Sequence, residues 1–251
     1  MYLWYNIQVS RLLHACEIPQ CALKAYLMAN TTKNKIFKST LLASFGLFLF
    51  GFGVYLTIQA NIGVGPWDAF NLGLSNTFNI KYGTASITVS LIILAIDICL
   101  KEKIGIGMLL DAFIVGKTVD LFNAINLVPA QTSFLSSLIV INAGMIIMGF
   151  SQFLYMKAGL GCGPRDTLLV GLKRKIAKVP IGAISICLLA IVTAIGYLLG
   201  GPIGIGTLLS AALEGYYMQW AFKIVHFDPT KIRHQSLIES WRILVGAKAD
   251  N

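Results

Sequence analysis

Two short segments of this 251-residue chain carry the same arrangement of glycine, proline and aspartate. Residues 62–68 read IGVGPWD, and residues 160–166 read LGCGPRD. Proline is favoured in the first turn of a helix, and an aspartate two positions later lies near the positive end of the helix dipole. The preceding glycines allow irregular backbone and close packing. Each motif therefore predicts an irregular segment followed by a helix with a carboxylate in its first turn.

Two roles fit these paired motifs, and the sequence leaves both open. Asp68 and Asp166 can simply cap two short helices. Alternatively, the helix N-termini line a solute pathway, in which N–H groups suit an anionic or zwitterionic group and the carboxylates suit a cation or proton. Trp67 and Arg165 differ between the copies, and Arg165 can counter a substrate charge, pair with Asp166 or act as a topology charge. The candidate substrate-binding residues are Gly65, Pro66, Trp67, Asp68, Gly163, Pro164, Arg165, Asp166, Asp120 and Gln219.

Ionisable residues inside apolar segments form a second group of candidates, because such residues are costly in lipid and are often functional. Lys117 and Asp120 are three residues apart and can form an ion pair on a helix, or Asp120 and Gln219 can face a central cavity. Glu214 lies near the middle of an apolar segment without an obvious local partner. We expect Glu214, Asp111 and Lys117 to be candidates for ion or proton coupling.

Enzyme, metal and cofactor motifs are not expected in this chain. The histidines, at positions 14, 226 and 234, lie outside the apolar segments, and no phosphate-binding or nucleophile motif is present. The five cysteines do not have the spacing that is typical of zinc ligands, and we interpret them as small apolar residues. We therefore expect no enzyme activity, no cofactor and no metal. The net charge of +9 is divided among short clusters rather than one basic face, so nucleic acid is not an expected partner.

The elements that position these residues are expected to be membrane helices. Hydrophobic residues make up 56% of the chain and charged residues 12%, more apolar side chain than a soluble domain of this size can bury. A membrane-spanning helix needs about 20 apolar residues. Six segments meet this length, at about 39–59, 83–100, 106–127, 134–156, 181–199 and 206–224. Two shorter apolar segments, at about 66–76 and 164–174, follow the two motifs and are expected to be re-entrant half-helices.

Lysine and arginine indicate the orientation, because they are enriched in cytoplasmic connections. With six spans, the basic clusters near residues 33–38, 101–103, 157–178 and 223–242 all lie in the cytoplasm, and so do both termini. An eight-span arrangement would place Lys101, Lys103 and Lys157 outside. We expect an N-terminal cytoplasmic extension at 1–38, repeats at 39–128 and 129–225, and a cytoplasmic tail at 226–251. Residues 1–27 are expected to be either a dispensable extension or the result of a misassigned start, because Met28 resembles a natural start.

The two motifs belong to a longer internal repeat. Gly83 with Ser86-Ile87 matches Gly182 with Ser185-Ile186, and the sequence IGIG recurs at residues 104–107 and 203–206. Further along, Gly116 matches Gly215. Each half contains three spans, and an odd number places the two copies in opposite orientations. The predicted fold class is therefore an all-α membrane protein with an inverted 3+3 repeat, an arrangement common in secondary transporters whose sites lie between the repeats.

These motifs resemble the YczE-type family of bacterial integral membrane proteins, within the YczE/YyaS/YitT group. The similar residues are 65–68 (GPWD), 83–87 (GTASI), 116–120, 163–166 (GPRD) and 198–207 (LLGGPIGIGT), and the resemblance extends from about residue 40 to 222. It implies a multi-pass protein of the bacterial cytoplasmic membrane. The family is largely uncharacterised, so the resemblance implies no particular activity.

Two functions remain open at this point. The first is a transporter or facilitator of a small polar or charged solute, in which the lipid bilayer and an unknown solute are the partners. The second is a non-transporting membrane partner of an export or biosynthetic system, which would dock through the basic segment 173–178 and the basic tail. A second copy of the chain or another membrane protein is a further expected partner.

Overall fold

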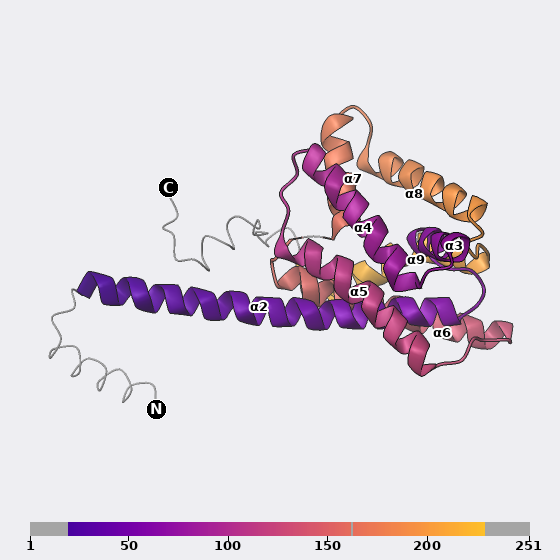
Figure 1. Ribbon diagram of the computed structural model, residues 1–251, viewed down its shortest axis with the longest axis horizontal. Coiled ribbons are helices and arrows are strands. Elements are labelled where there is room, and N and C mark those ends of the chain that lie inside the picture. Colours follow the sequence, from indigo (N-terminus) through magenta and orange to yellow (C-terminus); the bar gives the residue numbers. More distant parts are fainter. Residues whose placement is uncertain (1–19, 162, 229–251) are drawn as a thin grey trace. The chain divides into compact units, whose positions relative to one another are not determined.

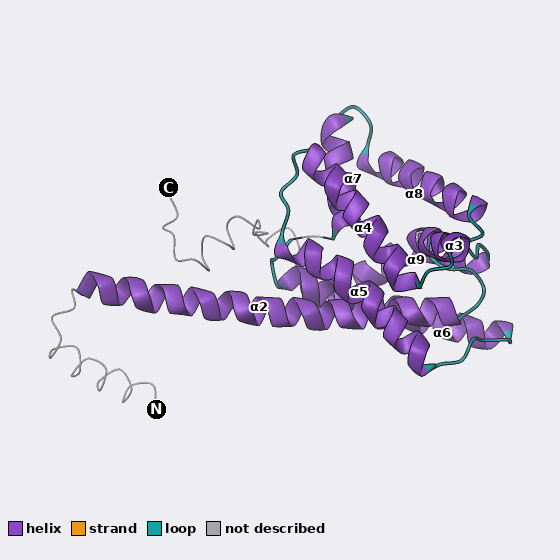
Figure 2. Cartoon of the chain, in the orientation of Figure 1, coloured by secondary structure: helices purple, strands orange, loops and turns teal. Residues whose placement is uncertain are grey.

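The computed structural model describes residues 20–161 and 163–228, and in these residues it contains helices and no strands (Figures 1 and 2). The all-helical prediction is confirmed, with helices close to the eight predicted segments. They are α2 (Gln20–Gln59), α3 (Pro66–Phe78), α4 (Tyr82–Cys99), α5 (Ile106–Ile125), α6 (Phe134–Lys157), α7 (Pro164–Lys175), α8 (Ile181–Leu198) and α9 (Ile205–Ile224).

The chain divides into two compact units, residues 1–38 with 238–251, and residues 39–237. All the predicted site residues belong to the second unit. The predictions for residues 1–19 and for the tail beyond 228 lie outside the described residues.

Helices α3 and α7 begin where the repeated motifs predicted. Gly65 and Gly163 precede them in extended conformations, and Pro66 and Pro164 occupy the first turn. Earlier in each motif a glycine adopts a left-handed backbone, with φ of 99° at Gly63 and 117° at Gly161. A residue with a side chain rarely adopts these angles, so both positions require glycine.

The starts of these two helices are held by reciprocal hydrogen bonds between the halves of the sequence. The backbone N–H of Gly107, at the start of α5, donates to the carbonyl of Leu160 at 2.9 Å. The backbone N–H of Gly206, at the start of α9, donates to the carbonyl of Ile62 at 2.7 Å. Each half therefore binds the motif of the other half through its own IGIG segment.

The core of this unit lies between α2, α4, α5 and α6. Its buried members include Leu47, Val54, Tyr82, Val115 and Met148. Helix α6 also packs against α9, and α3 packs against α8.

Large apolar side chains also cover the outside of the unit. Ile186 is 72% exposed, Leu198 82% and Leu208 74%. A soluble surface rarely carries so many exposed aliphatic residues, whereas a surface in contact with lipid does.

Four helical segments are long and apolar enough to cross a membrane by length and composition: Ile36–Gln59, Tyr82–Cys99, Phe134–Lys157 and Ile181–Leu198. Helices α5 and α9 have 20 residues each, about 30 Å of helix, which is also sufficient to span. They do not meet the same composition criterion, and α5 contains three charged side chains while α9 contains Glu214 and Lys223. Membrane helices are therefore confirmed, while the count of six stays a prediction.

Candidate functional site

A cavity of about 390 Å³ lies between the two repeated motifs, with walls from α2 to α9. A volume of this size is typical of small-molecule sites. Its described polar lining consists of Trp67, Asp68, Ser86, Ser90, Asp111, Gln152, Tyr155, Arg165, Asp166, Ser185, Ser210 and Glu214, and its apolar lining includes Phe50, Val54, Val115, Met148 and Leu188. Gly65, Pro66 and Gly163 also line it, so both motifs meet at one cavity.

Asp68 is held at the wall of this cavity by a hydrogen bond from helix α4. Its side chain is buried, with the residue only 6% exposed. The Tyr82 hydroxyl, at the start of α4, donates a hydrogen bond of 2.8 Å to the carboxylate, and the Asn71 side-chain amide reaches the Tyr82 oxygen at 3.5 Å. Burying a carboxylate is costly unless such partners are present, so this network fixes Asp68 in place.

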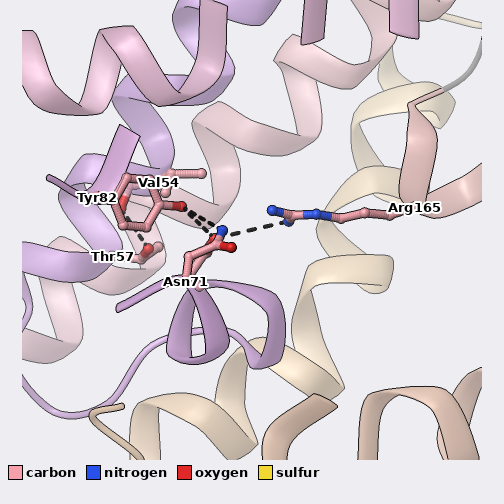
Figure 3. A network of polar contacts seen from close by, with 6 residues as sticks. Val54, Thr57, Asn71, Tyr82 and Arg165 are labelled. Carbon is pink, nitrogen blue, oxygen red and sulfur yellow. Dashed lines mark hydrogen bonds and ion pairs between the residues drawn. The ribbon is translucent and has the colours of Figure 1, made fainter. Parts of the chain in front are cut away.

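Arg165 connects the two motifs. Its guanidinium lies 4.0 Å from the carboxylate of Asp68 and 5.2 Å from the centre of the Trp67 ring. Figure 3 shows Arg165 reaching from α7 toward Tyr82 and Asn71 on the opposite side. Of the roles left open for Arg165, the structure favours a contact with a carboxylate, but with Asp68 of the other motif rather than with Asp166.

Three further carboxylates face the cavity. The Tyr155 hydroxyl, from α6, donates to Asp166 at 3.4 Å. Within the described part of the chain, neither Asp111 on α5 nor Glu214 on α9 has a hydrogen bond or an ion pair shorter than 4 Å. Four carboxylates therefore share the cavity with one guanidinium.

Four predicted site residues lie outside the cavity lining: Asp120, Lys117, Gln219 and Pro164. Asp120 accepts a hydrogen bond of 2.8 Å from the backbone N–H of Gly83, and so joins α5 to the start of α4. Lys117 is exposed on α5, and Gln219 is exposed on α9. Pro164 is fully buried beneath the cavity lining rather than part of it.

Sequence reasoning missed several polar residues of the cavity lining: Ser86, Ser90, Gln152, Tyr155, Ser185 and Ser210. It also missed Tyr82, which is outside the lining and donates to Asp68. Ser210 is 3% exposed and its hydroxyl has no hydrogen-bond partner in the described structure. It lies one helical turn before Glu214, so the two side chains share a face of α9. The spacing of Ser210 and Glu214 was the one local signal in the sequence that could have indicated Ser210. The contacts of Tyr82 with Asp68 and of Tyr155 with Asp166 form only when the helices pack together.

The two halves differ in how their last two spans pack. In the first half, α4 and α5 touch at glycines, since a side chain on Gly116 would meet the carbonyl of Gly83 at 2.9 Å. In the second half, the matching Gly182 of α8 and Gly215 of α9 have no neighbouring atom within 4 Å of where a side chain would start. The cavity lining includes Gly215 and Ser185 from this looser pair.

No metal ligand group is apparent in the residues that the structure describes. Nowhere in 20–161 and 163–228 do three or more His, Cys, Asp or Glu side chains gather closely enough to hold an ion. The carboxylates of the cavity are therefore dispersed over its walls.

Comparison with known proteins places these features in a family. The chain is 35% identical over 179 residues to the uncharacterised membrane protein YczE of Bacillus subtilis strain 168, covering 70% of this chain and 81% of YczE. It is 32% identical over 190 residues to the uncharacterised protein YyaS of the same organism, covering 72% and 92%. It is 29% identical over 189 residues to an uncharacterised protein of Haemophilus influenzae strain Rd, covering 75% and 85%.

No solved structure matches this chain. A family of unknown function, DUF6198, matches residues 37–223, which contain both motifs and every cavity residue. The chain therefore belongs to the DUF6198 family, and with its apolar helices and its similarity to YczE it is a YczE-type membrane protein.

Proposed function

We propose that this protein is a transporter or facilitator that carries a small polar or charged solute across the bacterial cytoplasmic membrane, without catalysing a reaction. The observation that carries the proposal is the single cavity lined by both Gly-Pro-x-Asp motifs. Irregular backbone at membrane depth is tolerated where it lines such a cavity, and matching interrupted segments in two halves mark the sites of many transporters.

The arrangement that we propose has six spans and two half-helices as an inverted repeat, with both termini in the cytoplasm. Helices α3 and α7 have 13 and 12 residues, about 20 Å of helix each, which is too short to span. The reciprocal hydrogen bonds from Gly107 to Leu160 and from Gly206 to Ile62 support a two-fold relation between the halves.

The difference between the two glycine contacts suggests how the solute moves. One pair of spans, α4 and α5, is closed at Gly83 and Gly116, and its counterpart, α8 and α9, is open at Gly182 and Gly215. In transporters with inverted repeats, exchange of conformation between the repeats opens the site alternately to each side. We infer that α8 and α9 close when α4 and α5 separate.

The test is solute uptake into proteoliposomes, with a panel of cationic, neutral and anionic small molecules. We expect Asp68→Asn, Asp166→Asn and Glu214→Gln each to reduce the uptake of any active solute at least tenfold. Glu102→Gln is the matched control, because Glu102 lies outside the cavity and pairs with Arg174 at 3.0 Å. If all three cavity variants transport as the parent does, the site is assigned wrongly.

The alternative function, a docking partner for another membrane system, has weaker support. The basic segment is engaged within the chain, since Lys173 donates to the carbonyls of Ala177 and Val179 at 2.6 and 2.8 Å and Arg174 pairs with Glu102. A co-purifying protein that is lost when Lys173, Arg174 and Lys175 are neutralised would favour this alternative.

A further inference from the structure

We propose that the cavity selects an organic cation, an amine, guanidine or quaternary ammonium with an apolar body. This inference deepens the proposed function by naming the class of solute. It rests on the charges of the cavity, on an unpartnered buried hydroxyl and on the character of the walls.

The charge balance of the cavity is negative. Its described lining has four carboxylates, Asp68, Asp111, Asp166 and Glu214, against the single guanidinium of Arg165. Arg165 is already committed, with Asp68 at 4.0 Å and the face of Trp67 at 5.2 Å. Of the remaining three carboxylates, Asp166 is exposed to the cavity and Asp111 and Glu214 are partly buried. A cation that enters the cavity is attracted by all three, and the attraction is stronger there than in bulk water.

The helix N-termini do not favour an anion, although the motifs alone left that open. Each half-helix already has its own carboxylate in the first turn, Asp68 in α3 and Asp166 in α7. These carboxylates already interact with the positive ends of the helix dipoles. An anionic solute would have to compete with them for the same positions. An anion would also meet Asp111 and Glu214.

A second, independent feature points to a ligand on the α9 wall. The residue Ser210 belongs to the cavity lining and is 3% exposed, and its buried hydroxyl has no hydrogen-bond partner in the described structure. Buried polar groups are nearly always satisfied, so an orphaned hydroxyl beside an unpaired carboxylate indicates a missing partner. An ammonium or guanidinium group donates to several acceptors and can serve both Ser210 and Glu214.

The walls distinguish an organic cation from a metal ion. No three acidic, histidine or cysteine side chains among the described residues are close enough to hold a metal ion. Apolar side chains lie between the carboxylates, including Phe50, Met148 and Leu188. Dispersed carboxylates on apolar walls suit a charged group attached to a hydrocarbon or aromatic body.

The test compares three molecules with the same aromatic body: benzylamine, which is cationic at neutral pH, benzyl alcohol and benzoate. Isothermal titration calorimetry of the full chain in detergent should show benzylamine binding at least tenfold more tightly than the other two. Glu214→Gln and Asp111→Asn should each weaken benzylamine binding at least tenfold, and Glu102→Gln should leave it unchanged. If benzyl alcohol or benzoate binds as tightly as benzylamine, or if none of the three binds, the inference is overturned.

Transport separates this inference from the proposed function. If benzylamine binds as expected but no organic cation crosses proteoliposomes, the cation site stands and the transporter proposal fails. If neutral or anionic solutes cross and organic cations do not, the transporter proposal stands and the cation site fails.

Discussion

At the residue scale, the central feature is a buried carboxylate that other helices hold in place. Asp68 receives a hydrogen bond from Tyr82 at 2.8 Å and faces Arg165 at 4.0 Å. The motif predicted the position of Asp68 in a helix start, because Pro and Gly determine that start locally. It could not predict Tyr82 or the pairing with Arg165, because these partners lie 14 residues away and on another helix.

The Tyr82 contact gives a prediction about stability. Tyr82→Phe removes the donor and leaves the buried carboxylate of Asp68 with one partner fewer, which should cost about 1–3 kcal/mol. Thermal unfolding of the purified protein in detergent should therefore show a lower midpoint. Tyr216→Phe is the matched control, because the Tyr216 side chain is 66% exposed. Equal midpoints for the two variants would show that the hydroxyl of Tyr82 does not support Asp68.

At the element scale, the same pair of helices is packed differently in the two halves. Helices α4 and α5 meet at Gly83 and Gly116, and the hydrogen bond from Gly83 to Asp120 joins them further. The matching glycines of α8 and α9 have open space around them. Sequence comparison of the halves predicted that these glycines are equivalent. It could not predict that only one pair is in contact, because two similar sequences can pack in two different ways.

Alanine should therefore destabilise the protein at Gly83 and have little effect on stability at the matching Gly182. In Gly83→Ala, the added carbon would lie 2.5 Å from the carbonyl of Gly116, an overlap that should cost about 1–3 kcal/mol or more. Gly182→Ala meets no neighbour and should change stability by about 0.5 kcal/mol or less. Thermal unfolding measures both effects.

The Gly182→Ala variant also tests the alternating mechanism. If α8 and α9 must close as α4 and α5 do, this stable variant should slow solute uptake severalfold, because the added methyl group occupies the contact. Uptake at the rate of the parent would mean that α8 and α9 do not close at this glycine.

At the scale of the whole molecule, the apolar surface and the family membership identify a membrane protein, while its orientation is a prediction from lysine and arginine. Four helical segments meet the length and composition of a span. Helices α5 and α9 are less apolar, and they carry Asp111 and Glu214 to the cavity wall. These charged side chains therefore line the cavity inside the unit instead of facing lipid.

The orientation can be tested with single cysteines in a variant that lacks the natural ones, of which Cys99 and Cys187 are exposed. An impermeant maleimide added to intact cells should label Lys81→Cys, in the connection between α3 and α4. It should label Lys101→Cys and Lys175→Cys only after permeabilisation. Labelling of Lys101→Cys in intact cells would favour the eight-span arrangement and contradict six spans.

The sequence by itself determined the helical segments, the helix starts at Pro66 and Pro164 and the apolar character that requires a membrane. These properties depend on residue type and on neighbours within a few turns, so local propensity and periodicity report them. Only the tertiary structure decided that Arg165 faces Asp68 and that Asp120 and Lys117 lie outside the cavity lining. It also decided that Ser210 and Glu214 line the same cavity as three other carboxylates. These outcomes depend on which helix faces approach one another, and that is set by packing across the whole unit rather than by any one segment.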